Sequence, residues 1–215
     1  MPSAIITRKK LHCCLQDVQT FSKPKLPLEQ YPTSAQVATD VLFNMQIQDG
    51  CLEGMAVADL GCGPGIFTIG ARLLGASYVL GVELDQDAVN DFSSNLDLYD
   101  LKNDSIDVLQ CDVVRLARDG DRKIVDTVIT NPPFGTNQAN AGIDTRFLRV
   151  ALSMASAHVY SLHKSSTREH IMRTVEVLGA NSKVVAELRF DIPRMYKRHR
   201  QETVDIAVDL VHCWF

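Results

Sequence analysis

Residues 56–65 read Ala-Val-Ala-Asp-Leu-Gly-Cys-Gly-Pro-Gly, an apolar run that passes directly into a turn with three alternating glycines. The run predicts a buried strand, and the helical pattern that follows over residues 66–74 completes a strand–turn–helix unit. Glycines let the backbone bend tightly and approach a ligand where a Cβ atom would clash. About one strand further on, Tyr78–Glu83 ends in a carboxylate, placed to accept the hydroxyls of a ribose. Together these stretches predict a site for a nucleoside cofactor.

The details of the glycine turn distinguish two kinds of cofactor. Gly61, Gly63 and Gly65 form G-x-G-x-G and lack the third glycine of the G-x-G-x-x-G dinucleotide pattern. Asp59 stands just before the turn, and a carboxylate there would repel a pyrophosphate group. The acid favours a cationic ligand that carries an ammonium and a sulfonium. S-adenosyl-L-methionine is such a ligand, and the stretch resembles motif I of the methyltransferases that use it.

A second motif, Asn131-Pro132-Pro133-Phe134, follows the apolar run 124–129 and is predicted to form a stiff loop at the end of a buried strand. Ligands of open α/β sheets bind at that end of the strands. The prolines lack an N–H and have a fixed φ, so their carbonyls are spare acceptors on a rigid turn. Asn131 adds an amide acceptor and Phe134 adds a flat face for a planar group. The tetrapeptide is therefore predicted to hold an amino group attached to a ring.

The adenine amine fits this loop as a methyl acceptor. Its lone pair is delocalised into the ring, so an enzyme must supply alignment and local electrostatics. We expect the Asn131 side chain and the Pro132 carbonyl to accept the two amine hydrogens and to aim the lone pair at the methyl group. Phe134 would stack on the base, a contact worth roughly 1–3 kcal/mol. The base would have to be unstacked or flipped to reach the loop.

The composition agrees with one enzyme domain of 215 residues, 46% of them hydrophobic. We expect residues 1–50 to form an N-terminal helical and lid segment, and residues 51–215 to form the catalytic core. No apolar window approaches the roughly 20 residues of a membrane span, so no membrane association is expected. The six cysteines show no metal-ligand spacing and are predicted to be reduced thiols, with no metal bound. We expect the protein to stay inside the cell.

Strands alternate with helices along the chain, which predicts an α/β fold with a mostly parallel sheet. The last two strands have no room for a helix between them and are predicted to pair as an antiparallel hairpin, an ending that resembles the Rossmann-like methyltransferase fold. The expected strands are Ala56–Leu60, Tyr78–Glu83, Ile106–Cys111, Lys123–Thr130, His158–Leu162, Ser182–Phe190 and Thr203–Cys213. The expected helices are Ser34–Met45, Ile66–Leu74, Gln86–Leu96, Thr145–Ala157 and Thr167–Leu178.

Two further features suggest macromolecular partners. If the strand order resembles that of the family, Ile106–Cys111 lies at an open sheet edge, where a protein could add a strand; a short edge that tolerates water is the alternative. Basic residues cluster over 194–200 although the net charge is −4. Lys and Arg clusters neutralise nucleic-acid phosphates, but ordinary solvated surface remains the alternative. Candidate RNA contacts are Lys164, Lys197, Arg198 and Arg200.

The motifs together closely resemble the methyltransferase-like protein five family, over nearly the whole chain. The stretches that carry the resemblance are Gln30–Thr33, Asp59–Gly63, Gln110–Val113, Asn131–Thr136 and Val159–His170. The resemblance implies N6-methylation of one adenosine in small-subunit (18S-type) ribosomal RNA. It also implies a heterodimer with a small zinc-binding activator protein, a candidate occupant of the edge strand, and a location in the nucleus (nucleolus), the cytoplasm or both.

The resemblance implies a role for each matching residue. Asn131 to Phe134 would form the catalytic loop, and Glu83 would hold the ribose. Gln30 and Thr33 would cover the methionine end, Gly61, Gly63, Pro64 and Ile66 would line the loop, and Asp112 and Val113 would border the adenine. Pro64 and Glu83 depart from the Cys and Asp that relatives can carry, but Glu83 keeps the carboxylate.

Two alternatives stay open on the residues alone. The same tetrapeptide could act on a glutamine side-chain amide of a protein or on adenine in DNA, since it accepts any planar amine or amide nitrogen. The chain could also be an inactive scaffold or an RNA-binding subunit. The intact Asp59, Glu83, Asn131 and Phe134 argue against loss of activity.

Overall fold

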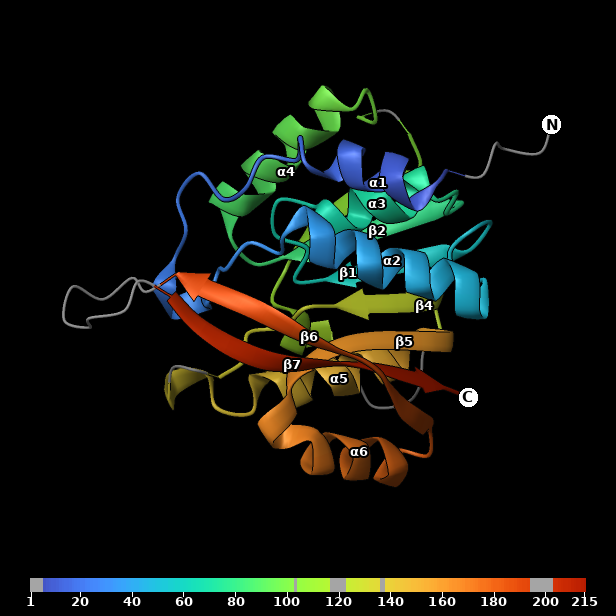
Figure 1. Cartoon of the computed structure of the whole chain (residues 1–215), viewed down its shortest axis with the longest axis vertical. Helices are drawn as coiled ribbons and strands as arrows, with labels where there is room; N and C mark the ends of the chain where they lie inside the picture. Colours follow the sequence, from blue (N-terminus) through green and yellow to red (C-terminus); the bar gives the residue numbers. More distant parts are fainter. Residues whose placement is uncertain (1–5, 103, 117–122, 136–137, 194–202) are drawn as a thin grey trace.

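The computed structural model describes residues 6–102, 104–116, 123–135, 138–193 and 203–215. Within them the chain forms a seven-stranded sheet of order β3-β2-β1-β4-β5-β7-β6, with helices on both faces (Figure 1). The strands are β1 (Ala56–Leu60), β2 (Tyr78–Glu83), β3 (Ile106–Gln110), β4 (Val125–Thr130), β5 (Ala155–Lys164), β6 (Asn181–Pro193) and β7 (Thr203–Trp214). The first five strands pair in parallel, whereas β7 runs antiparallel to both β5 and β6. The predicted α/β fold with a closing hairpin is confirmed.

The described segments also contain six α-helices and four short 3-10 turns, of which α1, η1 and α2 precede the first strand. The α-helices are α1 (Arg8–Leu15), α2 (Ala35–Asp49), α3 (Ile66–Leu73), α4 (Gln86–Leu98), α5 (Ile143–Met154) and α6 (Arg168–Val177). The 3-10 turns are η1 (Leu26–Leu28), η2 (Val113–Leu116), η3 (Gln138–Asn140) and η4 (Ser165–Thr167). Each predicted strand and helix is present, and the differences lie at the ends of elements.

Two of these end differences have clear physical causes. Helix α2 continues to Asp49 rather than ending at Met45, because Gly50 adopts the left-handed conformation that closes a helix. The predicted helix over Thr145–Ala157 ends at Met154, where Ala155 turns to extended backbone and begins β5. The start of β5 pairs with Val125 of β4, so its hydrogen bonds to a neighbouring strand decide the boundary.

Two apolar clusters, one on each face, hold the helices to the sheet. On one face, α1, α2, α3 and α4 contribute side chains such as Leu15, Leu42 and Phe92. On the other face, α5 and α6 contribute Leu148 and Ile171. The strands in between are buried on both sides, as expected for parallel strands covered by helices.

A segment that we call the strap, residues 16–34, joins α1 to α2. In Figure 1 it runs from α1 past α4 to the end of the molecule from which the β6–β7 hairpin projects, and then returns to α2. That end carries the carboxyl ends of the parallel strands, where ligands of α/β sheets bind. The strap is therefore positioned to cover a site formed by the loops after these strands.

Gly65 has a strict conformational requirement at the start of α3. Its φ is +94°, and a Cβ atom there would lie 2.5 Å from Cδ2 of the Phe92 ring. Phe92 is a fully buried residue of α4 and cannot move aside without a cost to the packing. Gly142 at the start of α5 has a similar φ of +72° but no atom within 4 Å of its Cβ position.

We predict that Gly65→Ala lowers the free energy of unfolding by about 3 kcal/mol, because left-handed strain and overpacking against Phe92 add together. Gly142→Ala is the matched control and should cost only about 1–2 kcal/mol, from the backbone strain alone. Urea denaturation of both purified variants measures the difference. Equal losses would show that the contact with Phe92 does not limit position 65.

Candidate active site

A cavity of about 470 Å³ opens at the carboxyl ends of the parallel strands, within the usual size range of small-molecule sites. Its walls come from the turn after β1, from the end of β2, from the loops after β3 and β4, and from the strap. Most predicted site residues line it: Gln30, Thr33, Gly61, Gly63, Pro64, Ile66, Glu83, Asp112, Val113, Asn131 and Pro133. The sequence motifs, separated by up to a hundred residues, therefore meet around one space.

The glycine turn is a cradle with room for backbone only. A Cβ atom on Gly63 would lie 2.8 Å from the Phe21 ring, and one on Gly61 would lie 3.1 Å from the Phe147 ring. Both aromatic rings line the cavity. The turn can thus bring its peptide groups close to a ligand, as the sequence predicted.

Glu83 anchors this turn to the end of β2. Its Oε2 accepts the N–H of Gly63 at 2.9 Å, and its Oε1 accepts the N–H groups of Leu84 and Asp85 at 2.8 and 2.9 Å. Burial raises the pKa of the carboxyl, while these three bonds act in the opposite direction. A carboxylate offers about four lone pairs, so three are used and one on Oε2 remains. Glu83 is therefore able to accept one ribose hydroxyl in this conformation, rather than the two expected from the sequence.

Asp59 differs from its predicted role as a cofactor contact. Its side chain is buried, is absent from the cavity wall and accepts the Thr68 hydroxyl at 2.8 Å. Burial raises its pKa to about 7. The carboxyl joins β1 to α3 beneath the turn, and any effect on a cationic ligand acts through space rather than by contact.

Asn131 projects into the cavity from the loop after β4. Its Nδ2–H donates to the Thr33 hydroxyl of the strap at 3.0 Å. Its Oδ1 is enclosed and has no hydrogen-bond partner among the described residues. A buried carbonyl without a donor is costly, so this oxygen is a ready acceptor for a ligand amine.

Two residues of the tetrapeptide do not line the cavity, contrary to the prediction. Pro132 is buried, and Phe134 is only 6% exposed. The Phe134 ring makes an edge contact with Phe190 of β6, with centroids 5.8 Å apart and planes at 88°. A base can therefore stack on Phe134 only after Phe190 or the ring itself moves.

The strap is fastened along the first half of α4. Lys25 pairs with Asp85 and, at 3.0 Å, with Asp87, while the Ser22 N–H donates to Asp91 at 2.9 Å. Burial opposes ionisation of Asp85, but the bonds from Lys25 and Gln30 outweigh it and lower the pKa of this carboxyl. The acids also lie at a helix N-terminus, where negative charge is favoured.

Gln30, predicted to cover the methionine end, lies in the strap and lines the cavity. Its Nε2 donates to Asp85 at 2.9 Å, and its Oε1 accepts the Lys25 N–H at 2.7 Å. Both ends of the amide are occupied by the protein. Gln30 lines the cavity, and its two hydrogen bonds hold the strap against the start of α4.

The strap is also fastened on the side of the tetrapeptide. Asn140, in η3, donates through Nδ2 to the Pro27 carbonyl at 2.9 Å and to Glu29 Oε1 at 3.0 Å. Glu29 has a φ of +52°, a left-handed conformation that is uncommon outside glycine. The strap thus bridges the cofactor half and the tetrapeptide half of the site.

Sequence reasoning missed Asp85, Asn95 and Asn140, which all hold the strap or the turn. Asn95 is fully buried and bonds both the Gln19 backbone and the Pro64 carbonyl at 2.9 Å. Asp85 gave a signal, since an Asp just before an amphipathic run caps a helix. Asn95 and Asn140 gave none, because their partners are distant in the chain.

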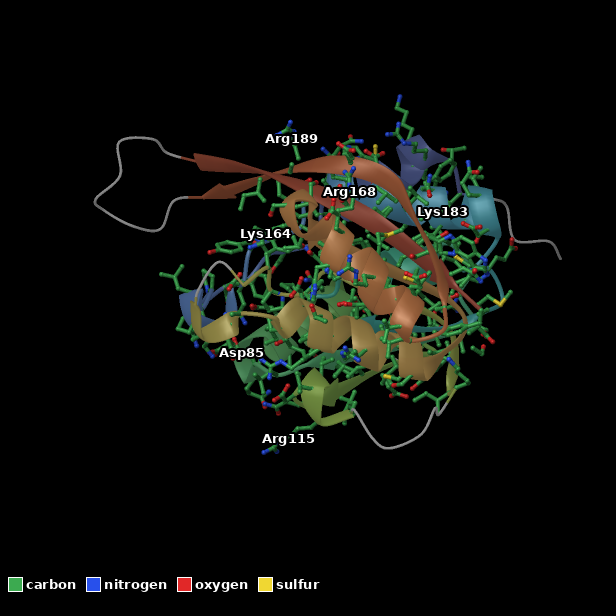
Figure 2. All side chains as sticks on the ribbon, turned by 90° about the horizontal axis from the view of Figure 1, so that it is seen from below. Asp85, Arg115, Lys164, Arg168, Lys183 and Arg189 are labelled. Atoms are coloured by element: carbon green, nitrogen blue, oxygen red, sulfur yellow. The ribbon has the colours of Figure 1, made fainter. Side chains whose placement is uncertain are left out.

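Asp112 and Lys164, two further predicted contacts, lie within the described residues. Asp112 accepts the Val114 N–H at 3.0 Å, so its carboxylate is fixed at the cavity rim. Lys164 lies at the same end of the molecule as Asp85 and the projecting hairpin (Figure 2). Lys197, Arg198 and Arg200 lie outside the described residues.

Two kinds of feature are absent from the segments that the structure describes. None of the helices in these segments is long and apolar enough to cross a membrane. No group of three or more His, Cys, Asp or Glu side chains in the same segments could hold a metal ion.

Comparisons with known proteins give consistent results. A family model described as ribosomal protein L11 methyltransferase (PrmA) matches residues 38–132. The chain is 46% identical over 203 residues to the Danio rerio protein named rRNA N(6)-adenosine-methyltransferase METTL5, covering 94% of this chain and 96% of that protein. It is 47% identical over 201 residues to the Drosophila melanogaster protein of the same name, covering 94% and 93%. The crystal structure of PH1948 from Pyrococcus horikoshii, described as a candidate RNA methyltransferase, is 32% identical, with coverages of 96% and 95% and a TM-score of 0.78.

The raised pKa of Asp59 predicts a pH dependence of stability. In the folded protein this carboxyl keeps its proton up to about pH 7, whereas the ordinary value is 3.8. The unfolded chain binds fewer protons between these values, so stability falls as the pH rises from about 4 to 7, by at most ~1.4 kcal/mol per pH unit. Asp59→Asn keeps an acceptor for Thr68 and should flatten this fall, as measured by the free energy of unfolding across that range.

The control for this measurement is Asp97→Asn, which removes a half-exposed carboxylate of α4 that pairs with Lys102. It should leave the pH profile as in the unchanged protein. If Asp59→Asn also leaves the profile unchanged, the Asp59 carboxyl is ionised in the folded state at neutral pH.

Proposed function

Because the chain belongs to the family of rRNA N(6)-adenosine-methyltransferases, we propose that it methylates the N6 nitrogen of one adenosine in small-subunit (18S-type) ribosomal RNA. The protein is an enzyme that uses S-adenosylmethionine. We place the reaction in the nucleus, including the nucleolus, or in the cytoplasm, where ribosomal RNA is made and used. We further propose which residues align the substrate and which protein binds to the enzyme.

The observation that carries the proposal is the enclosed Oδ1 of Asn131, a residue that lines the cavity, which has no donor among the described residues. Such an oxygen can accept a hydrogen bond from a substrate once the substrate reaches it, and an exocyclic amine has two hydrogens to give. The neighbouring glycine cradle and Glu83 provide the features that a nucleoside with an amino-acid tail requires. The residues present therefore fit S-adenosylmethionine on one side of Asn131 and an adenosine amine on the other.

Bound S-adenosylmethionine supplies a methyl group on a positively charged sulfur. The role of the chain is to align the acceptor with it. Asn131 Oδ1 accepts one hydrogen of the amine, and the Pro132 carbonyl accepts the other once a shift of the loop brings this buried residue to the cavity. The two bonds draw the lone pair of the amine out of the ring plane. An amine held in this way would take the methyl group that the bound cofactor supplies, with the carbon–sulfur electron pair leaving on the sulfur, and would then release one proton to water. For this alignment the adenosine must leave its stack, and Phe190 must give access to Phe134.

The strand edge supports a second part of the proposal, a heterodimer with a small zinc-binding activator protein. β3 is an outer strand of the sheet, and its Ser105 carbonyl and Cys111 N–H bond to β2. Because bonding alternates along a parallel strand, the peptide groups of Val108 and Gln110 face away from β2, whereas the outward Ile106 N–H already donates to the Asp104 carbonyl at 2.7 Å. Leu109 of this strand is 42% exposed. An added strand from the partner would satisfy these groups and cover this side chain.

RNA phosphates are the third part of the proposal. Lys164 at the end of β5 and Lys197, Arg198 and Arg200 would neutralise the backbone beside the entering base. Lys164 is supported by its place at the end of the molecule that carries the cavity (Figure 2). The other three residues are proposed from the sequence alone.

Nucleoside mass spectrometry of ribosomal RNA from cells with and without this protein tests the substrate. Loss of N6-methyladenosine from the small-subunit RNA alone is the expected result. Transfer of label from the cofactor to that RNA should exceed transfer to DNA or to a protein glutamine amide. The match to the ribosomal protein L11 methyltransferase model ends at residue 132, so it speaks for the cofactor half and not for a protein substrate.

We predict that Asn131→Ala lowers turnover by at least about 100-fold, because a preorganised acceptor for the amine is lost. Cofactor affinity should change less than about threefold, as measured by calorimetry, since Glu83 and the glycine turn are untouched. Equal losses of turnover and of cofactor affinity would instead assign Asn131 to the cofactor.

We predict that Leu109→Glu weakens association with the activator by about 100-fold or more, because an unpaired charge would be buried at the contact. Co-purification from cells that express both chains measures this. Val177→Glu is the matched control: Val177 is 76% exposed at the end of α6, away from β3. If Leu109→Glu associates as Val177→Glu does, the partner does not use this edge.

A further inference from the structure

The hydrogen bond between Asn131 and Thr33 joins the loop after β4 to the strap. Nδ2 of Asn131 donates to Oγ1 of Thr33 at 3.0 Å, and Asn131 Oδ1 is left enclosed without a partner among the described residues. Both side chains line the cavity. The direction of this one bond therefore decides which end of the Asn131 amide is left without a partner and can bind a substrate.

The alternative direction would remove the acceptor. A hydroxyl can both accept and donate, so Thr33 could equally donate its proton to Oδ1 if the amide turned over. The two NH₂ donors of Asn131 would then face the amine of the substrate, whose hydrogens are donors as well. Two sets of donors repel, and the amine could not be aligned.

The position of Thr33 is itself tightly fixed. Pro32 precedes it with a locked φ, and Ser34 follows as the N-cap of α2, accepting the Val37 N–H at 3.2 Å. The strap before it is tied by Asn140 to Pro27 and Glu29. The hydroxyl is thus presented to Asn131 from a rigid support on both sides.

We propose that Thr33 is a positioning residue for methyl transfer, which fixes the Asn131 amide with Oδ1 toward the adenosine amine. This inference rests on the proposed function of Asn131. No acceptor among the described residues takes the hydroxyl proton of Thr33, so this proton can meet an anionic acceptor in the cavity that Thr33 lines, and the carboxylate of an amino-acid tail is such an acceptor. Once that proton is engaged, only the lone pairs of Thr33 face Asn131, and the amide has a single allowed direction.

Binding of the cofactor's amino-acid tail to Thr33 therefore fixes Asn131 Oδ1 as the atom that accepts the amine hydrogens of the substrate. A nucleoside without that tail fills the adenosine part of the cavity but leaves the Thr33 proton unengaged. The arrangement favours alignment of the adenosine only when a complete methyl donor is in place. Thr33 contributes this through Asn131 and needs no contact with the base.

The first experiment measures kcat at saturating cofactor for Thr33→Val, which has nearly the same shape and lacks the hydroxyl, and for Thr33→Ser, which keeps it. We expect about a tenfold loss for Thr33→Val, the size of one neutral hydrogen bond, and less than a threefold loss for Thr33→Ser. Thr39→Val is the matched control, since the Thr39 hydroxyl donates to the Ala35 carbonyl within α2, at 2.7 Å, and Thr39 does not line the cavity. It should leave kcat unchanged.

The second experiment follows the Asn131 side-chain NH₂ signals by ¹⁵N NMR, identified as the pair that Asn131→Ala removes. S-adenosylhomocysteine, which carries the amino-acid tail, should slow their hydrogen exchange at least about fivefold in the unchanged protein and in Thr33→Ser. 5′-Methylthioadenosine, which lacks the tail, should not. In Thr33→Val neither ligand should slow the exchange.

The outcomes separate this inference from the proposed function. Full turnover by Asn131→Ala would refute the role of Asn131 itself. Loss of turnover in Asn131→Ala with an unchanged kcat in Thr33→Val would refute only the role of Thr33. Equal slowing of exchange by S-adenosylhomocysteine in Thr33→Val and in the unchanged protein would also refute it, because another group would then hold the amide.

Discussion

The Glu83 carboxylate is the interaction on which the cofactor end of the site depends. A buried carboxylate is tolerated only when its lone pairs are satisfied, and here three backbone N–H groups do so. One of them belongs to Gly63, so the acid at the end of β2 also fixes the shape of the turn after β1. The remaining lone pair on Oε2 is the one that a ribose hydroxyl can use. The Glu83 side chain therefore both fixes the shape of the glycine turn and can bind the ribose.

The strap converts this open end of a sheet into an enclosed space. Its fastenings differ in kind: charged pairs to the start of α4, and neutral amide bonds to the loop after β4. The charged pairs on α4 are partly exposed and weaken with salt, whereas the bond to Asn131 is shielded. The half of the strap near α4 is thus the part that solution conditions can loosen. The half beside Asn131 retains its geometry because it continues directly into a capped helix.

The sequence predicted the fold and many of the residues that line the cavity, because both depend on local patterns. An apolar run followed by alternating glycines can be recognised without knowing what packs on it, and so can a proline pair after a strand. The sequence did not predict that Asp59 turns away to Thr68, or that Phe190 covers the Phe134 ring. Those facts depend on side chains from elements far apart in the chain. Gln30 shows the same limit, since its motif was recognised but its amide is used by Asp85 and Lys25.

The order of the last two strands constrains how the sheet can be assembled during synthesis. β7 lies between β5 and β6, although it follows β6 in the chain. When β6 has left the ribosome, its neighbour in the sheet does not yet exist, and the edge of β5 is still open. β6 can therefore join the sheet only through β7, which is made after it. Since β6 also brings Phe190 to the Phe134 ring, that side of the cavity is completed only once β7 is in place.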